Sequence, residues 1–189
     1  HWKAGSSLRV SALEKGIGIE VYATRSPGIG GNIRQFPEDF VVEEVLSDGS
    51  KASVKSTVAP LAQGRGRYLV CVIVKRNWDT LLAVRTIAKQ LGVSQERIQI
   101  AGIKDARALT AQHISIGRIT PQQISSVKIK DLTIYPQRFA NEKIHSNMLF
   151  GNQFYIFIRA IVHSSSEIEE RMKNVESELE SLGGAPNFF

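Results

Sequence analysis

The sequence of 189 residues has a single cysteine, Cys71, and therefore no internal disulfide. It has no run of about 18 apolar residues, the length that a membrane-spanning helix needs. Its four histidines show no metal-ligand spacing. It also lacks a Gly-x-x-x-x-Gly-Lys-Ser/Thr phosphate loop and a Gly-x-Ser-x-Gly nucleophile elbow. These absences favour a soluble cytoplasmic protein and argue against zinc, P-loop and serine-hydrolase chemistry.

Acidic side chains are scarce outside one segment. Of the 24 basic and 18 acidic residues, two basic and six acidic residues lie between positions 167 and 182. The rest of the chain therefore holds 22 basic and 12 acidic residues. A surplus of Lys and Arg is suited to neutralising phosphates. The charge distribution thus favours a body that binds a polyanion, together with one acidic helix.

Apolar patterning predicts several β-strands. Residues 33–36 and 40–46 read as two short strands, or as one strand broken at Pro37 because proline cannot donate to a ladder. Residues 68–74 form a continuous apolar run, which predicts a central strand buried on both faces. Further strands are expected at 98–100, 109–116, 132–135 and after a turn at Gly151-Asn152. Residues 47–66 read as a long mobile loop.

Two capped helices separate these strands. Asn77 or Asp79 can cap a helix that ends at Gly92, with Leu81, Val84, Ala88 and Leu91 on its apolar face. Ser166 and Glu169 predict the capping box of a final helix that ends at Gly183-Gly184 and packs against a sheet. A short helical or turn segment begins at Thr120-Pro121. The pattern predicts an α+β fold with a mixed, mostly antiparallel sheet and helices on one face.

Residues 101–112 carry the most distinctive chemistry of the chain. They place Asp105 at the tip of a polar loop between two strands, with Lys104 and Arg107 as flanking cations. Neighbouring positive charge favours the ionised carboxylate, which suits a nucleophile better than a general acid. The alternative is a solvated turn with a surface ion pair worth ~0–1 kcal/mol. The loop chemistry alone does not decide between these two interpretations.

The whole stretch resembles the catalytic signature Ala-Gly-x-Lys-Asp-x-x-Ala-Val-Thr-x-Gln of the TruD family of tRNA pseudouridine synthases. One departure is Ala106, where members of that family usually carry a basic residue. Matching residues are Ala101, Gly102, Lys104, Asp105, Ala108, Thr110 and Gln112.

Three further elements resemble the same family, and together with residues 101–112 they occur in the family's order along the chain. Pro37-Glu38-Asp39-Phe40, with Val42 and Glu44, is similar to a Pro-Glu-Asp-Phe-x-Val-x-Glu element, and Arg34 stands where the family often has Lys. Gly151-Asn152-x-Phe154-x-Ile156 is similar to a Gly-Asn-x-Phe-x-Ile element. Pro186-Asn187-Phe188 resembles the start of a Pro-Asn-Tyr-Phe-Gly signature, and residues 18–31 resemble archaeal members.

The resemblance implies the pseudouridine synthase fold, of which this chain would supply one ferredoxin-like or RRM-like half. Residues 1–32 would be an N-terminal extension, and 33–189 would be the N-terminal part of the catalytic domain of a longer enzyme. The implied activity is isomerisation of uridine to pseudouridine at position 13 of tRNA, without a metal or organic cofactor. Asp105 would be the catalytic aspartate. The implied substrate-binding residues are Arg34, Phe40, Lys104, Asn152 and Phe154, with Phe154 stacking on the flipped uracil.

Two other interpretations remain open at this stage. Without the resemblance, the composition indicates a basic α+β domain that binds RNA. A non-catalytic RNA-binding module would keep the basic surface but not the chemistry. A structural or protein-binding domain would show no salt-dependent affinity for RNA.

Overall fold

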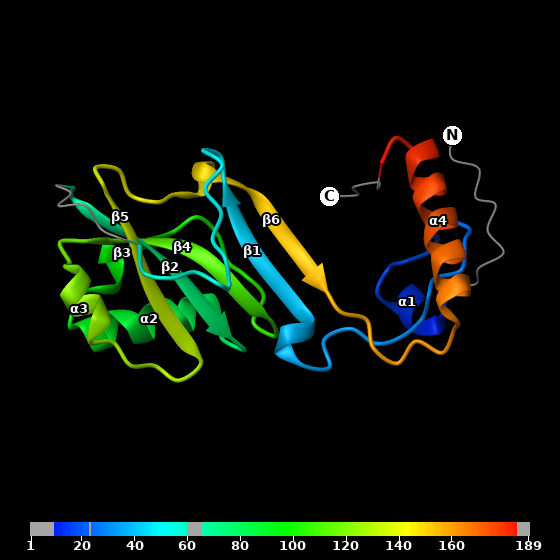
Figure 1. Ribbon diagram of the computed structural model, residues 1–189, viewed down its shortest axis with the longest axis horizontal. Coiled ribbons are helices and arrows are strands. Elements are labelled where there is room, and N and C mark those ends of the chain that lie inside the picture. The colour runs from blue at the N-terminus through cyan, green and yellow to red at the C-terminus, as the bar shows by residue number, and fades with distance from the viewer. Residues whose placement is uncertain (1–9, 23, 60–65, 185–189) are drawn as a thin grey trace. The chain divides into compact units, whose positions relative to one another are not determined.

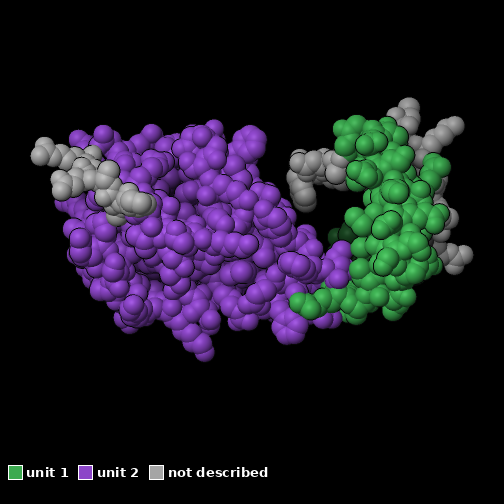
Figure 2. All heavy atoms as spheres, in the orientation of Figure 1, with its two compact units in different colours: residues 1–32, 159–189 green, residues 33–158 purple. Residues whose placement is uncertain are grey.

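The computed structural model describes residues 10–22, 24–59 and 66–184 (Figure 1). The chain divides into two compact units, which Figure 2 colours separately. One unit comprises residues 33–158, and the other combines residues 1–32 with residues 159–189. The assignment of residues 33–189 to one catalytic domain stays a prediction. Pro186-Asn187-Phe188 lies outside the described residues.

The unit of residues 33–158 is built on a six-stranded sheet with the order β5-β2-β4-β1-β6, and β3 also pairs with β4. The pairing of β1 with β4 is parallel, and the other strand pairings between described residues are antiparallel. The predicted α+β fold with a mixed, mostly antiparallel sheet is thus confirmed. The strands are β1 (Phe40–Leu46), β2 (Tyr68–Arg76), β3 (Ile98–Ile100), β4 (Leu109–Gly117), β5 (Leu132–Ala140) and β6 (Leu149–Ile156).

One edge of β4 is shared by two strands. Strand β2 pairs with one edge of β4 along its whole length, and β1 and β3 share the opposite edge. Strand β1 pairs with residues 109–111, and β3 pairs with residues 114–116. Gln112 and His113 lie at the fork between them, where neither strand supplies a ladder partner. Side chains must satisfy the backbone at this fork.

The helices α2 (Thr80–Leu91) and α3 (Pro121–Ser125) pack on one face of the sheet. Their buried side chains, including Ile87 and Ile124, join Cys71 and Ile73 of β2 in the main apolar core. On the other face, Val70 and Val72 of β2 are also buried. The prediction that this strand is buried on both faces is confirmed.

The buried face of α2 is rotated from the predicted one. Asp79 is the N-cap and accepts a hydrogen bond from the backbone N–H of Leu82, and Gly92 ends the helix with a φ of 64°. Leu81, which was expected to face the core, is half exposed. The helix buries Thr80, Ala83, Val84, Ile87 and Ala88. The small side chain of Ala83 did not identify it as a core position.

Strand boundaries also differ from the predictions. Residues 33–36 form no strand, because Arg34 has a φ of 59° and Pro37–Asp39 form a short 3-10 helix, η1. A second and a third 3-10 helix, η2 (Gln95–Arg97) and η3 (Ser146–Met148), precede β3 and β6. Gly151 and Asn152, predicted as a turn, lie inside β6.

The segment predicted as a mobile loop is folded over its described first part. The backbone N–H of Ala52 donates to the carbonyl of Glu44 at 2.9 Å, and Ala52 is fully buried. The Glu43 carboxylate accepts hydrogen bonds from Ser53 and from the backbone N–H of Val54. Residues 60–65 lie outside the described part of the chain.

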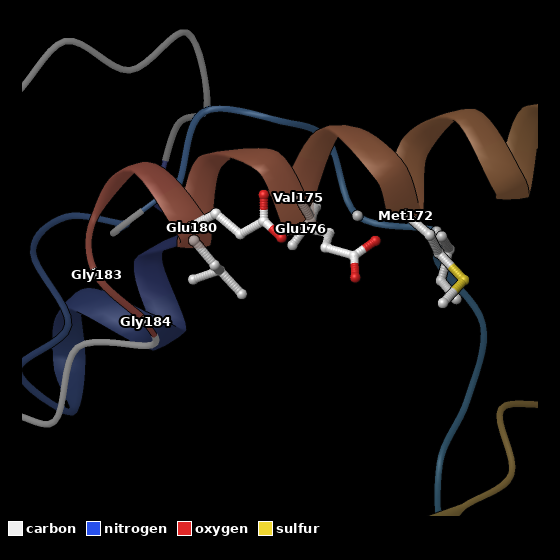
Figure 3. A pocket seen from close by; sticks show the side chains of 9 residues that line it. Met172, Val175, Glu176, Glu180, Gly183 and Gly184 are labelled. Carbon is white, nitrogen blue, oxygen red and sulfur yellow. The ribbon is translucent and has the colours of Figure 1, made fainter.

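The second unit contains the helices α1 (Ala12–Gly16) and α4 (Ser165–Ser181). The capping box of α4 is formed by Ser164 and Glu167, two residues earlier than predicted, and the predicted end near Gly183 is confirmed. Packing of α4 against a sheet stays a prediction, because the sheet belongs to the other unit; no residue of α4 is buried. Its apolar side, including Met172 and Val175, lines an open pocket within this unit (Figure 3). No described helix is long and apolar enough to span a membrane.

Candidate active site

The connection between β3 and β4, residues 101–108, is here called the Asp105 loop. Lys75, near the end of β2, anchors this loop on its buried side. Its Nζ donates to the backbone oxygen of Asp105 at 3.0 Å and to that of Trp78 at 2.7 Å. Lys75 is fully buried, and its register places it beside the start of β4. The backbone position of Asp105 is therefore tied to the central sheet.

A second attachment joins the loop to α2 and β4. The backbone N–H of Lys104 donates to Thr80 Oγ1 at 3.1 Å, and that hydroxyl lies within 3.3 Å of both the Lys104 carbonyl and Gln112 Oε1. Gln112 Nε2 donates to the carbonyl of Gly102 at 3.0 Å. Thr80 and Gln112 are fully buried. Side chains thus replace the strand partners that the loop backbone lacks.

A buried charge cluster lies at the fork of β4. Glu44 Oε1 is 2.8 Å from Lys104 Nζ, and Glu44 Oε2 is 2.8 Å from the backbone N of His113 and 3.1 Å from its Nδ1. Burial raises the pKa of Glu44, but the hydrogen bonds from His113 and Lys104 and the Lys104 charge outweigh it and hold the pKa below its usual value. The carboxylate therefore fills the gap between β1 and β3 in its ionised form.

At Lys75 the penalty of burial outweighs the nearby opposite charges. It lowers the pKa of Lys75 to about 8, although the carboxylates of Asp79 and Asp105 favour the charged form. The Lys104 charge lowers the pKa further. Lys75 is thus a hydrogen-bond donor whose charge is costly at this position.

The open side of the loop carries a row of four side chains. Arg34 Nη2 lies 2.7 Å from Asp105 Oδ1, and the two side chains are 37% and 35% exposed. The Arg34 guanidinium lies 3.8 Å above the centre of the Phe40 ring, a cation–π contact. The Phe40 and Phe154 rings meet edge to face with centroids 5.8 Å apart. The structure therefore brings Asp105, Arg34, Phe40 and Phe154 together.

Neither Lys104 nor Arg107 forms an ion pair with the Asp105 carboxylate, although the sequence suggested them as its flanking cations. Lys104 is only 5% exposed and pairs with Glu44, while Arg107 is exposed. Successive side chains of an extended stretch point to opposite sides, so Lys104 faces inward where Asp105 faces outward. The cation beside Asp105 comes instead from Arg34, which is 71 residues away in sequence.

Asn152 lies on the same face of the sheet as Phe154, two positions earlier on β6. It is the register partner of Glu44, as Phe154 is of Val42. Its side chain is exposed and makes no hydrogen bond to another described residue. The amide is therefore available to a ligand, but no contact joins it to Asp105.

The open side combines an accessible carboxylate, a fixed cation and an aromatic ring that is 48% exposed. Such a ring can stack on an unpaired base, and the carboxylate can act on an atom of the bound nucleotide. Within the described ranges, no group of three or more His, Cys, Asp and Glu side chains could hold a metal ion.

Several residues of the site had no role assigned from the sequence. The sequence indicated Glu44 and Gln112 only as parts of the matched elements. It indicated no role for Lys75, Thr80 or His113. The available signal was the polar residue Lys75 at the end of an otherwise apolar strand, since a buried lysine requires partners.

Comparison with known proteins identifies the family. The family model "tRNA pseudouridine synthase D (TruD)" matches residues 16–189. "Probable tRNA pseudouridine synthase D" of Methanosarcina barkeri is 40% identical over 184 residues, covering 96% of this chain and 39% of that protein. The protein with the same description from Archaeoglobus fulgidus is 38% identical over 181 residues, with coverages of 94% and 39%.

A solved structure agrees with the fold. The crystal structure of the TruD protein from Methanosarcina mazei matches with a TM-score of 0.80 and 37% identity, over 96% of this chain and 39% of that one. The chain thus spans about 39% of the length of these relatives. Its sequence and its fold agree that the chain belongs to the tRNA pseudouridine synthase D (TruD) family.

Proposed function

We propose that the full-length protein isomerises uridine to pseudouridine in tRNA, with Asp105 as the catalytic aspartate. The observation that supports this most strongly is the row of Asp105, Arg34, Phe40 and Phe154 on the open side of a loop that is fixed from below. The relatives named above carry the same activity in their names.

In the proposed reaction the uridine leaves the stack, because its C1′ and C5 atoms are inaccessible within a helix. Asp105 acts on the ribose or the base, and the bond between N1 and C1′ breaks. The detached uracil turns and forms a bond from C5 to C1′, and the proton on C5 is released while N1 gains one. The atoms balance without a cofactor.

The residues around Asp105 have distinct proposed roles. Phe154 stacks on the extruded uracil, and Asn152 donates or accepts a hydrogen bond at its edge. Arg34 orients the Asp105 carboxylate and contacts the nucleotide, and Phe40 supports both Arg34 and Phe154. Lys104, which was expected to contact the substrate, instead supports the loop through Glu44.

The proposal includes uridine 13 as the target and the cytoplasm as the location. It is tested by incubating the full-length protein with tRNA transcripts that carry tritium at C5 of uridine. We expect tritium release from the wild-type transcript and none from a transcript with cytidine at position 13. Release from both transcripts would contradict the position but not the activity. Salt-dependent binding without any release would contradict the activity and favour a non-catalytic RNA-binding module.

A further inference from the structure

A basic groove lies at the end of β4 that is remote from the Asp105 loop. We propose that this groove binds the phosphate backbone of the tRNA at a second point, an inference that rests on the proposed function. Its volume is about 660 Å³, and it is lined by Arg67, Tyr68, Glu96, Arg97, Gln99, Gly117, Arg118 and Lys143. Four cations and one carboxylate thus surround it.

The position of the groove suits a second contact with a long ligand. The Asp105 loop precedes Leu109, the first residue of β4, whereas Gly117, its last residue, lines the groove. Eight steps along a strand cover about 26 Å at ~3.3 Å per residue. A mononucleotide cannot span this distance. A folded RNA held at Asp105 extends far enough for its phosphates to reach the groove.

Backbone hydrogen bonds position three of the four cations of the groove. Strand pairing ends with Tyr68 opposite Gly117, and one residue further the N–H of Arg118 donates to the carbonyl of Arg67 at 3.2 Å. Arg118 adopts a left-handed conformation with a φ of 54°. Arg97 Nε donates to the carbonyl of Gly117 at 2.9 Å, which anchors its guanidinium against the end of β4. The end of β4 therefore gives the groove a hydrogen-bonded backbone.

Three of the cations have unpaired charges. In the described ranges, no carboxylate forms an ion pair with Arg67, Arg118 or Lys143, and all three are exposed. The remaining cation, Arg97, bonds only to neutral backbone carbonyls. Clustered cations with no internal partner favour a polyanion, because each phosphate contact releases a condensed counterion. Because these cations come from separate segments of the chain, the groove is better suited to an extended phosphate backbone than to a single small anion.

The test compares two triple variants of the full-length protein that lose the same charge. The groove variant is Arg67→Gln/Arg118→Gln/Lys143→Gln. The control variant is Arg85→Gln/Lys89→Gln/Lys128→Gln, whose three cations are also exposed but do not line the groove. For each protein, the tRNA Kd is measured across a salt series, and tritium release gives kcat and KM.

We expect the groove variant to raise Kd and KM about tenfold at physiological salt, with kcat unchanged. Its slope of log K against log salt should become shallower by about 2–3, one contact per cation removed. The control variant should change Kd less than twofold. Equal effects of the two variants, or no effect of either, would overturn the proposal that the groove binds tRNA.

Two further readouts keep the interpretation clear. Glu96→Gln removes the carboxylate from the groove and should tighten tRNA binding, so an unchanged or weaker affinity would count against the proposal even if the triple variant failed to fold. If the wild-type protein binds tRNA through the groove but releases no tritium, the proposed function fails and the groove stands. If inorganic phosphate binds there but tRNA affinity is insensitive to the three substitutions, the RNA assignment is wrong.

Discussion

On its open side the Asp105 loop presents a carboxylate and an arginine that are each about one-third exposed, beside a half-exposed phenylalanine. On its buried side the same loop rests on side chains with almost no exposed surface: Lys75, Thr80, Gln112 and the cluster of Lys104, Glu44 and His113. Adjacent residues of the loop lie on opposite sides: Lys104 belongs to the buried side and Asp105 to the open side.

The two sides of the loop therefore have different proposed roles, the open side in substrate binding and catalysis and the buried side in folding. Residues on the open side can be replaced at small cost in folding, because water already reaches them. Residues on the buried side hold charges and backbone groups that have no other partners. Substitutions there should therefore destabilise the protein first, and affect the reaction only through the position of the loop.

The largest effect on stability is expected for Glu44→Gln. This variant keeps the shape of the side chain but leaves the Lys104 ammonium buried without a counter-ion. Breaking a buried pair in this way costs about 3–5 kcal/mol, which urea unfolding of the full-length protein would measure. A loss below about 1 kcal/mol would mean that the buried charges do not hold the fork.

Two variants serve as controls for Glu44→Gln. Glu43→Gln changes the adjacent carboxylate, whose partner Lys51 is 35% exposed and can return to water, so a loss of about 1 kcal/mol is expected. The double variant Glu44→Gln/Lys104→Met removes both charges and should recover part of the lost stability.

An intermediate effect is expected for Lys75→Met. The carbonyls of Asp105 and Trp78 lose their donor, and an unsatisfied buried group costs about 1–3 kcal/mol. Because the Asp105 backbone is no longer fixed, kcat should fall about tenfold while the tRNA Kd stays within twofold, as tritium release and filter binding would show. Unchanged kcat would contradict a positioning role.

The pH dependence of stability gives a second readout for Lys75. Between about pH 8 and its ordinary pKa of 10.5, the unfolded chain keeps a proton that the folded chain has released, so this residue makes stability rise with pH. Cys71 acts in the opposite direction, because burial raises the pKa of its thiol to about 12. The stability of wild type relative to Lys75→Met should therefore increase over this window, and a constant difference would contradict the assigned cause.

The smallest effect on stability is expected for Phe154→Ala. Its ring is 48% exposed, so the loss should stay below about 1 kcal/mol, against about 3–5 kcal/mol for a core phenylalanine. Loss of base stacking, worth ~1–3 kcal/mol, should lower kcat/KM about 5- to 150-fold. Phe150→Ala, on the same strand and 79% exposed, is the matched control and should leave kcat/KM unchanged.

The sequence predicted the sheet and the open side of the site better than the buried side. Residues 68–74 were predicted correctly because a continuous apolar run of this kind is typical of a strand buried on both faces. Asp105, Arg34, Phe40 and Phe154 were found through matched sequence elements, and the structure places them together. The predicted roles of these residues still depend on the proposed reaction.

The contacts on the buried side could not be predicted from the sequence, because the tertiary structure determines which side chains meet there. The inward direction of Lys104 depends on the path of the loop, and the role of Glu44 depends on β1 and β3 sharing one edge of β4. Neither fact is encoded in local periodicity. For the same reason Gly151-Asn152 was misread as a turn: turn-forming residues were placed in a strand by pairing with β1.

The proposed role of Asp105 is tested most directly by Asp105→Asn in the full-length protein. The substitution removes the charge on the open side and leaves the backbone oxygen that Lys75 holds. We predict that tritium release from tRNA is abolished, while the tRNA Kd and the free energy of unfolding stay within twofold and about 1 kcal/mol of wild type. Asp131→Asn, at an exposed turn, should keep full activity. Normal turnover by Asp105→Asn would contradict the assignment of the catalytic aspartate.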